Sequence, residues 1–152
     1  MVSPQERAWY YHGTAPEGDQ PELLYRSSSK ADRWVPPTGR YAGVPTKSIH
    51  SAHGTQLAAV WRDVGPLVNG LVSAAVRKSY SIDAVRYFTV PHREDDDKGT
   101  LGPAMVLVTV DPALNISPDT TRSVSGDILP LLAKQDVHDA HVEWCEGVTF
   151  RL

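Results

Sequence analysis

The sequence AMVLVTV, residues 104–110, decides the fold of this 152-residue chain. In an extended strand, successive side chains point to opposite faces, so Met105 and Leu107 share one face. The residues of the other face are Ala104, Val106, Val108 and Val110. A strand that is apolar on both faces is covered on both sides in the folded protein. We therefore expect a buried strand with two separate covers.

A helix and a second strand follow this strand in the sequence. Ser117, Pro118 and Asp119 are typical of a helix start, with an N-cap, a proline at the first helical position and a carboxylate in the first turn. Gly126 and Pro130 weaken this helix locally. Its apolar stripe consists of Val124, Ile128, Leu131 and Leu132. The closing strand is predicted to turn Ala140, Val142 and Trp144 toward the core and His141, Glu143 and Cys145 the other way.

The middle of the chain predicts another helix and two more strands. Thr55 is the natural N-cap of a helical apolar pattern that extends to about Lys78, and Pro66 predicts a kink or a break near Gly65. Strands are expected at residues 43–50 and 82–90, and a loop at 91–102. The resulting β-α-β-β-α-β order predicts an α+β two-layer sandwich of ferredoxin-like plan, with two helices on one face of an antiparallel sheet.

The N-terminal region has a different composition from the rest of the chain. Residues 1–54 hold six of the 12 prolines and four of the six tyrosines, with little periodicity. We expect residues 1–40 to form an irregular arm, partly ordered on a single α+β domain of residues 41–152. Either this arm, anchored by Trp9, Tyr25 or Trp34, or a second copy of the chain is expected to cover Met105 and Leu107.

Composition excludes several classes of function. A net charge of -3 offers no electrostatic footprint for nucleic acid, and no apolar run is long enough for a signal peptide or a membrane span. With one cysteine, Cys145, the chain cannot form an internal disulfide. We expect a soluble cytoplasmic protein. No nucleotide-binding glycine motif or serine-hydrolase motif is present, and no cofactor is predicted.

Several short segments resemble an uncharacterised protein family of mushroom-forming fungi, over about residues 21 to 152. The matching segments are Pro21-Glu22-Leu23-Leu24, Trp61 with Val64-Gly65-Pro66, Gly102-Pro103, Ser117-Pro118-Asp119-Thr120 with Val124-Ser125 and Ile128-Leu129, and Val142-Glu143-Trp144. In longer members of that family, a segment similar to a chymotrypsin-like serine protease follows this region. The resemblance implies an N-terminal accessory module and brings no catalytic residue.

Two histidine pairs have a spacing that could bind a metal ion. They are His50 with His53 and His138 with His141, and Asp139, Glu143 or Cys145 could supply a third ligand to the second pair. Neither pair lies on a predicted helix, as the metalloprotease motif requires, so we favour solvated or helix-capping histidines. The acidic run Glu94 to Asp97 lacks the spacing of a calcium loop and is interpreted as a solvated loop.

A possible catalytic row is formed by His141, Glu143 and Cys145, which share one face of the closing strand. Side chains two residues apart on a strand start about 7 Å from each other, which is too far for a Cys–His hydrogen bond. We therefore favour an edge-strand surface that carries one free thiol.

The leading hypothesis is a non-catalytic interaction or self-association module whose partner is itself or another protein domain. The first alternative is a small metal-assisted or Cys/His hydrolase that uses His138, His141, Glu143 and Cys145. The second is a small-ligand carrier with a pocket between the arm and the sheet.

Overall fold

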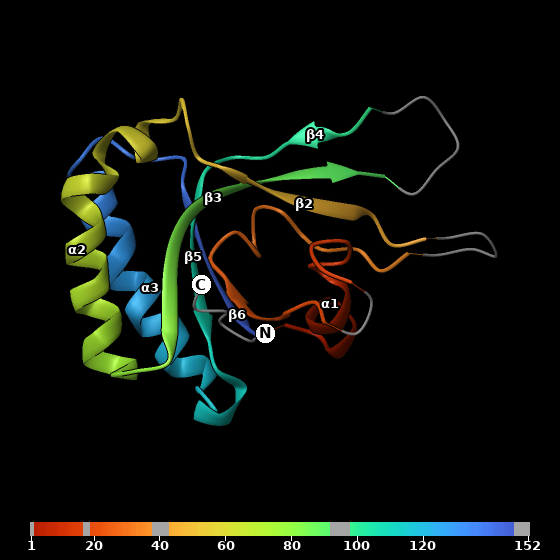
Figure 1. The fold of residues 1–152 in the computed structure, drawn as a ribbon, viewed down its shortest axis with the longest axis horizontal. Helices are drawn as coiled ribbons and strands as arrows, with labels where there is room; N and C mark the ends of the chain where they lie inside the picture. Colours follow the sequence, from red (N-terminus) through yellow and green to blue (C-terminus); the bar gives the residue numbers. More distant parts are fainter. Residues whose placement is uncertain (1, 17–18, 38–42, 92–97, 148–152) are drawn as a thin grey trace.

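The computed structural model describes residues 2–16, 19–37, 43–91 and 98–147 of the chain. Within these residues, the fold is a mixed α+β structure built on one six-stranded, curled sheet (Figure 1). The elements in chain order are α1 (Pro4–Trp9), β1 (Glu22–Arg26), β2 (Thr46–Ser51), α2 (Gln56–Val76), β3 (Tyr80–Val90), β4 (Thr100–Leu101), β5 (Met105–Val110), a 3-10 turn (Pro112–Leu114), α3 (Pro118–Ala133) and β6 (His141–Glu146).

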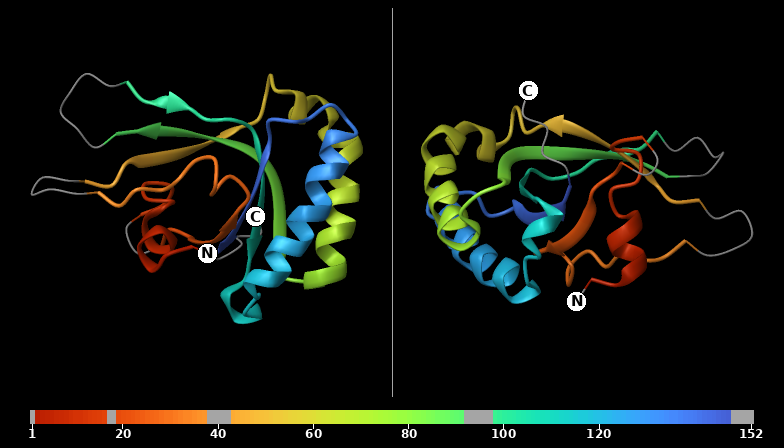
Figure 2. Two further views of the ribbon diagram at one scale, coloured as in Figure 1. Left: turned by 180° about the vertical axis from the view of Figure 1, so that it is seen from behind. Right: turned by 60° about the horizontal axis from the view of Figure 1, so that its bottom comes forward.

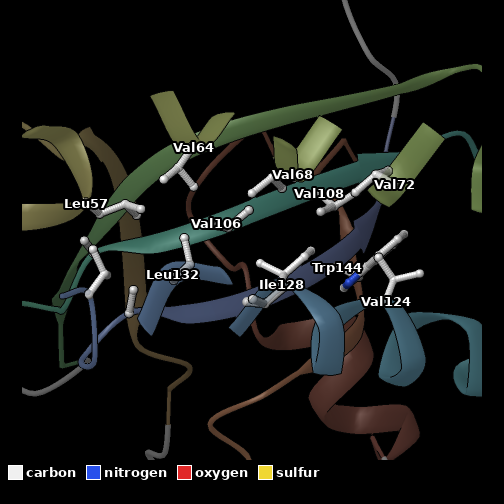
Figure 3. Packing of buried hydrophobic residues seen from close by; sticks show 14 of the residues in the cluster. Leu57, Val64, Val68, Val72, Val106, Val108, Val124, Ile128, Leu132 and Trp144 are labelled. Carbon is white, nitrogen blue, oxygen red and sulfur yellow. The ribbon is translucent and has the colours of Figure 1, made fainter. Parts of the chain in front are cut away.

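Helices α2 and α3 pack on one face of the sheet and close the larger hydrophobic core (Figure 3). The predicted face of β5 lies in this core, as do Val142 and Trp144 of β6, both 0% exposed. The Trp144 indole Nε1 donates a hydrogen bond of 2.9 Å to Ser125 Oγ on α3. The prediction of which face of β5 and of β6 points toward the helices is therefore confirmed.

Both helices begin where the sequence predicts and continue through their prolines. Thr55 and Ser117 are the N-caps, and their hydroxyl oxygens accept from Ala58 N and Thr120 N. The break considered near Gly65 does not occur, because α2 is continuous from Gln56 to Val76. Packing of one whole helix face on the sheet outweighs the loss of the Pro66 backbone donor.

The ferredoxin-like plan is not confirmed. Apart from α1, β1 and the short β4, the elements follow the predicted β-α-β-β-α-β order along the chain. Their order across the sheet is β1-β6-β5-β3-β2, with β4 paired to β3. In the ferredoxin-like plan, two strands that are joined through a helix do not pair with each other, because another strand lies between them in the sheet. Here β2 pairs directly with β3, and β5 pairs directly with β6 in parallel. The strands β2, β3, β5 and β6 thus lie side by side in chain order, and the short β4 also pairs with β3.

The N-terminal arm covers the second face of the sheet (Figures 1 and 2). Met105 and Leu107 are 5% and 6% exposed, in a cluster that also contains Tyr11 and Leu23 from the arm. Part of the arm joins the sheet, because β1 pairs antiparallel with β6. With covers on both faces of the sheet, the expected two-layer sandwich is not confirmed.

The arm's anchors differ from the expected ones. Trp9 is 39% exposed and its ring centroid lies 6.5 Å from that of Trp34, so these two rings contact each other at the surface. Tyr25 packs against the helix-side core.

Within the described residues, no helix is long and apolar enough to cross a membrane.

Candidate functional site

Glu143 of β6 is the centre of a buried polar cluster under the arm. The residue is 1% exposed, and each of its carboxylate oxygens accepts a hydrogen bond from a tyrosine of the arm. The Tyr10 hydroxyl donates to Oε2 at 2.7 Å, and the Tyr11 hydroxyl donates to Oε1 at 2.9 Å. Because a buried carboxylate without donors is strongly destabilising, these two bonds tie the arm to β6.

Two cations flank this cluster. Lys47 Nζ lies 3.1 Å from the centroid of the Tyr10 ring and 5.8 Å from that of Tyr87. The buried Arg26 donates to Glu6 Oε1 at 2.9 Å, and its guanidinium carbon lies 5.2 Å from the Tyr10 ring centroid. A cation is attracted to the face of an aromatic ring, so both contacts hold Tyr10 in place.

Burial changes the proton affinity of these groups. Burial raises the pKa of Glu143, against the opposing effects of the Tyr10 hydrogen bond and the Lys47 charge. Burial likewise lowers the pKa of Lys47 to about 8, although the nearby Glu143 opposes this change. It also raises the pKa of Tyr10 and Tyr11 well above the ordinary value, so both hydroxyls keep their protons and can donate.

Shifts of this kind occur both at catalytic sites and in structural networks. Both Glu143 oxygens are engaged by arm hydroxyls, and the side chain has almost no contact with solvent. In this arrangement Glu143 holds the arm on β6.

The predicted Cys/His row lies in an environment that does not favour nucleophilic chemistry. The interpretation of an exposed edge-strand face is wrong, because β6 lies between β1 and β5. Cys145 is a free thiol that is 1% exposed, and its Sγ lies 3.4 Å from Thr109 Oγ1. Burial raises the pKa of the Cys145 thiol to about 12, which keeps it protonated. His141 is half-buried, and the described side-chain partners of Glu143 and Cys145 are Tyr10, Tyr11 and Thr109, not His141.

The candidate metal ligands are spread over the surface. His50, His53 and His138 are exposed, and His138 Nε2 lies 3.5 Å from Asp136 Oδ1. Within the described residues, no group of three His, Cys, Asp or Glu side chains could hold a metal ion. The acidic run Glu94 to Asp97 lies outside the described residues.

A shallow hollow lies at the junction of α2 with the start of β3. The Tyr80 hydroxyl in it donates to Asn69 Oδ1 at 2.7 Å. The lining residues are Trp61, Arg62, Gly65, Pro66, Asn69, Tyr80, Ser81 and Ile82.

The outer edge of β2 is the second feature with functional potential. In an antiparallel pair, the backbone groups of alternate residues point toward the partner strand and away from it. Lys47 N points away from β3, since it donates to His12 O at 2.8 Å. Its strand neighbours Ile49 and Ser51, at steps of two, must have the same orientation.

The pairing partner of Ile49 supports this assignment independently. Ile49 lies opposite Tyr87 of β3, and Tyr87 O accepts from Gly102 N at 2.8 Å on the other side of β3. Within the described part of the chain, the outward N–H and C=O groups of Ile49 and Ser51 make no hydrogen bond. Residues 48–51 are all exposed, and Ile49 is 50% exposed.

The one lysine of β2 does not protect this edge. Natural sheets commonly block an open edge with a charged side chain, a proline or a bulge. Lys47 is turned onto the Tyr10 ring, and the pairing of β2 with β3 is regular from Thr46 to Ser51. The remaining residues of the strand carry short or apolar side chains, or the imidazole of His50.

No family model matches the chain, and no curated protein or solved structure is significantly similar to it. The resemblance to fungal proteins therefore stays a prediction, and the functional argument depends on the residues of the chain itself.

Proposed function

We propose that this protein is a non-catalytic protein-interaction module that binds an extended strand of another polypeptide at the outer edge of β2. The observation that carries the proposal is the row of outward backbone groups at Ile49 and Ser51, on a strand whose side chains are exposed. Such an edge is a template for strand addition, in which main-chain hydrogen bonds provide much of the affinity.

The chemistry of the other candidate groups supports a binding role over catalysis. A nucleophilic cysteine needs thiolate character and an adjacent base. Cys145 is buried, its pKa is raised to about 12, and its nearest polar partner is the Thr109 hydroxyl. Its free, buried thiol also supports our proposal of a reducing, cytoplasmic compartment.

The arm supports β2 as the interaction surface. Met105 and Leu107, the apolar residues first considered as a docking surface, are buried beneath Tyr11 and Leu23. Docking on that face would require the arm to leave and the Glu143 hydrogen bonds to break. The edge of β2 is accessible without any such change.

Strand addition is tested with peptides selected from a random library displayed on phage, panned on the full chain. Binding of the recovered peptides is then measured by fluorescence anisotropy to the parent protein, Ile49→Pro and Ile49→Thr. Proline at position 49 removes an outward N–H and leaves the bonds between β2 and β3 intact. Threonine keeps the N–H and the β-branched shape.

We expect the peptides to bind the parent and Ile49→Thr similarly and to bind Ile49→Pro at least tenfold more weakly. On binding, the amides of Ile49 and Ser51 should become protected from hydrogen exchange. Leu67→Gln, at an exposed apolar position on α2, is the surface control and should bind as the parent does. Equal binding to Ile49→Pro, or a selection that recovers no peptide, would refute strand addition. A melting curve of Ile49→Pro verifies that this variant is folded.

A further inference from the structure

The proposal here rests on the proposed function and specifies its partner. We propose that the strand added to β2 is the β2 strand of a second copy of this chain, antiparallel to the first. The two-fold axis passes beside His50, so that Ile49 of each copy lies opposite Ser51 of the other copy.

The outward backbone groups of β2 in one copy can pair with the same groups in a second copy. The outward groups of Ile49 and Ser51 are two N–H donors and two C=O acceptors. An antiparallel pair of residues whose groups point at each other exchanges two hydrogen bonds. With the axis at His50, the two such pairs, Ile49 with Ser51 and Ser51 with Ile49, form four bonds. Each copy thus contributes the same groups of Ile49 and Ser51, as an isologous interface requires.

The arm selects this register over its nearest alternative. An axis at Ile49 would pair Ser51 with Lys47 of the other copy. At that position the arm already occupies the edge of β2, because Lys47 N donates to His12 O. Gly13 of the arm also lies against the Lys47 backbone, so closely that a Cβ added to Gly13 would be 3.2 Å from both Lys47 N and Lys47 O. The axis at His50 ends the contact before Lys47, so the two arms remain in place.

The side chains agree with this pairing. Ile49 lies opposite Ser51 of the other copy and diagonal to its Ile49, within reach of apolar contact across the strands. The 50% exposed Ile49 side chain therefore gains cover. No lysine faces a lysine, because Lys47 would lie opposite position 53, beyond the end of β2, and its amine is held over Tyr10.

The interface is short, and this limits its strength. Four hydrogen bonds and one pair of isoleucines make an interface below the size of stable dimers, which bury at least about 1,200 Å². We expect a dimer that dissociates on dilution, with a dissociation constant between about 10 µM and about 1 mM.

Sedimentation velocity over this concentration range tests the dimer with the full chain. The parent and Ile49→Thr should rise from the mass of one chain toward that of two, whereas Ile49→Pro should remain at one. A parent that keeps the mass of one chain throughout, or an Ile49→Pro variant that associates like the parent, overturns the proposal.

Disulfide trapping tests the register. With the axis at His50, His50 faces His50 of the other copy, with Cα atoms about 4.5 Å apart, within the range that a disulfide bridges. The two Ile49 residues are then diagonal, about 7 to 8 Å apart, at or beyond that limit. Under mild oxidation, His50→Cys should give a covalent dimer faster than Ile49→Cys, with the parent as control for the buried Cys145. Faster trapping by Ile49→Cys would overturn this register.

The peptide experiment separates this inference from the proposed function. Peptides that bind the parent but not Ile49→Pro, together with a parent that remains a monomer, would refute the second copy as partner and leave strand addition standing. Failure of both experiments would refute both proposals.

Discussion

The two faces of the sheet are closed in different ways. On the helix side, α2 and α3 bring a continuous apolar surface onto β5 and β6, and Trp144 with its bond to Ser125 is the main polar feature. On the arm side, a smaller apolar cluster surrounds Glu143, which is held by the hydroxyls of Tyr10 and Tyr11.

This difference follows from the structure of each cover. A helix satisfies its own backbone bonds, so it can dock an entire apolar stripe. The arm has only the short helix α1 and the strand β1, so it brings no long apolar stripe to the sheet. Side-chain contacts also position it, among them the donors to one buried carboxylate. We therefore expect the helix face to be sensitive to lost volume and the arm face to lost hydrogen bonds.

The largest effect is expected when the arm's cover is removed and β1 is kept. Deleting residues 1–20 exposes Met105 and Leu107 and takes both hydroxyl donors from Glu143. The destabilisation should exceed the about 3–5 kcal/mol of a single buried aromatic truncation, and the truncated protein should associate. Chemical denaturation and sedimentation measure these effects. A truncated chain as stable as the parent would mean that the arm contributes no significant cover.

Trp144→Ala tests the helix face. Truncating this fully buried side chain should cost about 3–5 kcal/mol of the free energy of unfolding, measured by denaturant titration. Trp9→Ala, at a tryptophan that is 39% exposed, is the matched control and should cost about 1 kcal/mol or less. Similar losses for the two variants would contradict the packing of Trp144 beneath α3.

Tyr11→Phe tests the arm face with little change of volume. The variant removes a donor from a buried carboxylate, which should cost about 1.5–3 kcal/mol in the same titration. Tyr80→Phe removes the more exposed hydrogen bond to Asn69 and should cost less than about 1 kcal/mol. If Tyr11→Phe and Tyr80→Phe lost the same free energy of unfolding, the hydrogen bond to Glu143 would contribute no more than a surface hydrogen bond, and the arm face would not depend on it.

The smallest effect is expected in how stability depends on pH, which reports on Glu143 at the arm face. Because the pKa of Glu143 is raised in the folded protein, the folded state takes up this proton before the unfolded state does as the pH falls. Its contribution to stability therefore increases as the pH falls from 7 toward 4.5, the ordinary pKa of a glutamate, and is lost as the pH rises.

Glu143→Gln removes this titration. Relative to Glu143→Gln, the parent should gain melting temperature between pH 7 and pH 5, whereas the difference between the parent and Tyr80→Phe should stay constant. A parent that instead loses melting temperature relative to Glu143→Gln on acidification would show that Tyr10, Tyr11 and Lys47 outweigh the effect of burial.

The sequence predicted the helix side of the sheet in detail. The caps at Thr55 and Ser117, the two faces of β5 and the burial of Trp144 all follow from local periodicity and capping chemistry, which act within a few residues. It also indicated that the second face needs a cover. Glu143 on a predicted strand face, together with adjacent tyrosines in an aromatic arm, was the available signal for the polar cluster, but no short-range rule pairs residues 132 or more positions apart.

The tertiary structure alone decided the order of strands, the arm's anchors and the open edge. Strand order depends on which strands find each other in space, and the same β-α-β-β-α-β pattern is compatible with more than one order. The choice of Tyr10 and Tyr11 over Trp9 and Trp34 depends on where Glu143 lies. The strand pattern near residues 46–51 appears in the sequence, but whether its outer hydrogen-bonding groups are paired is a property of its neighbours. The sequence by itself thus determined the amphipathic elements, because their causes are local, and the assembled sheet determined which surface remains available for a partner.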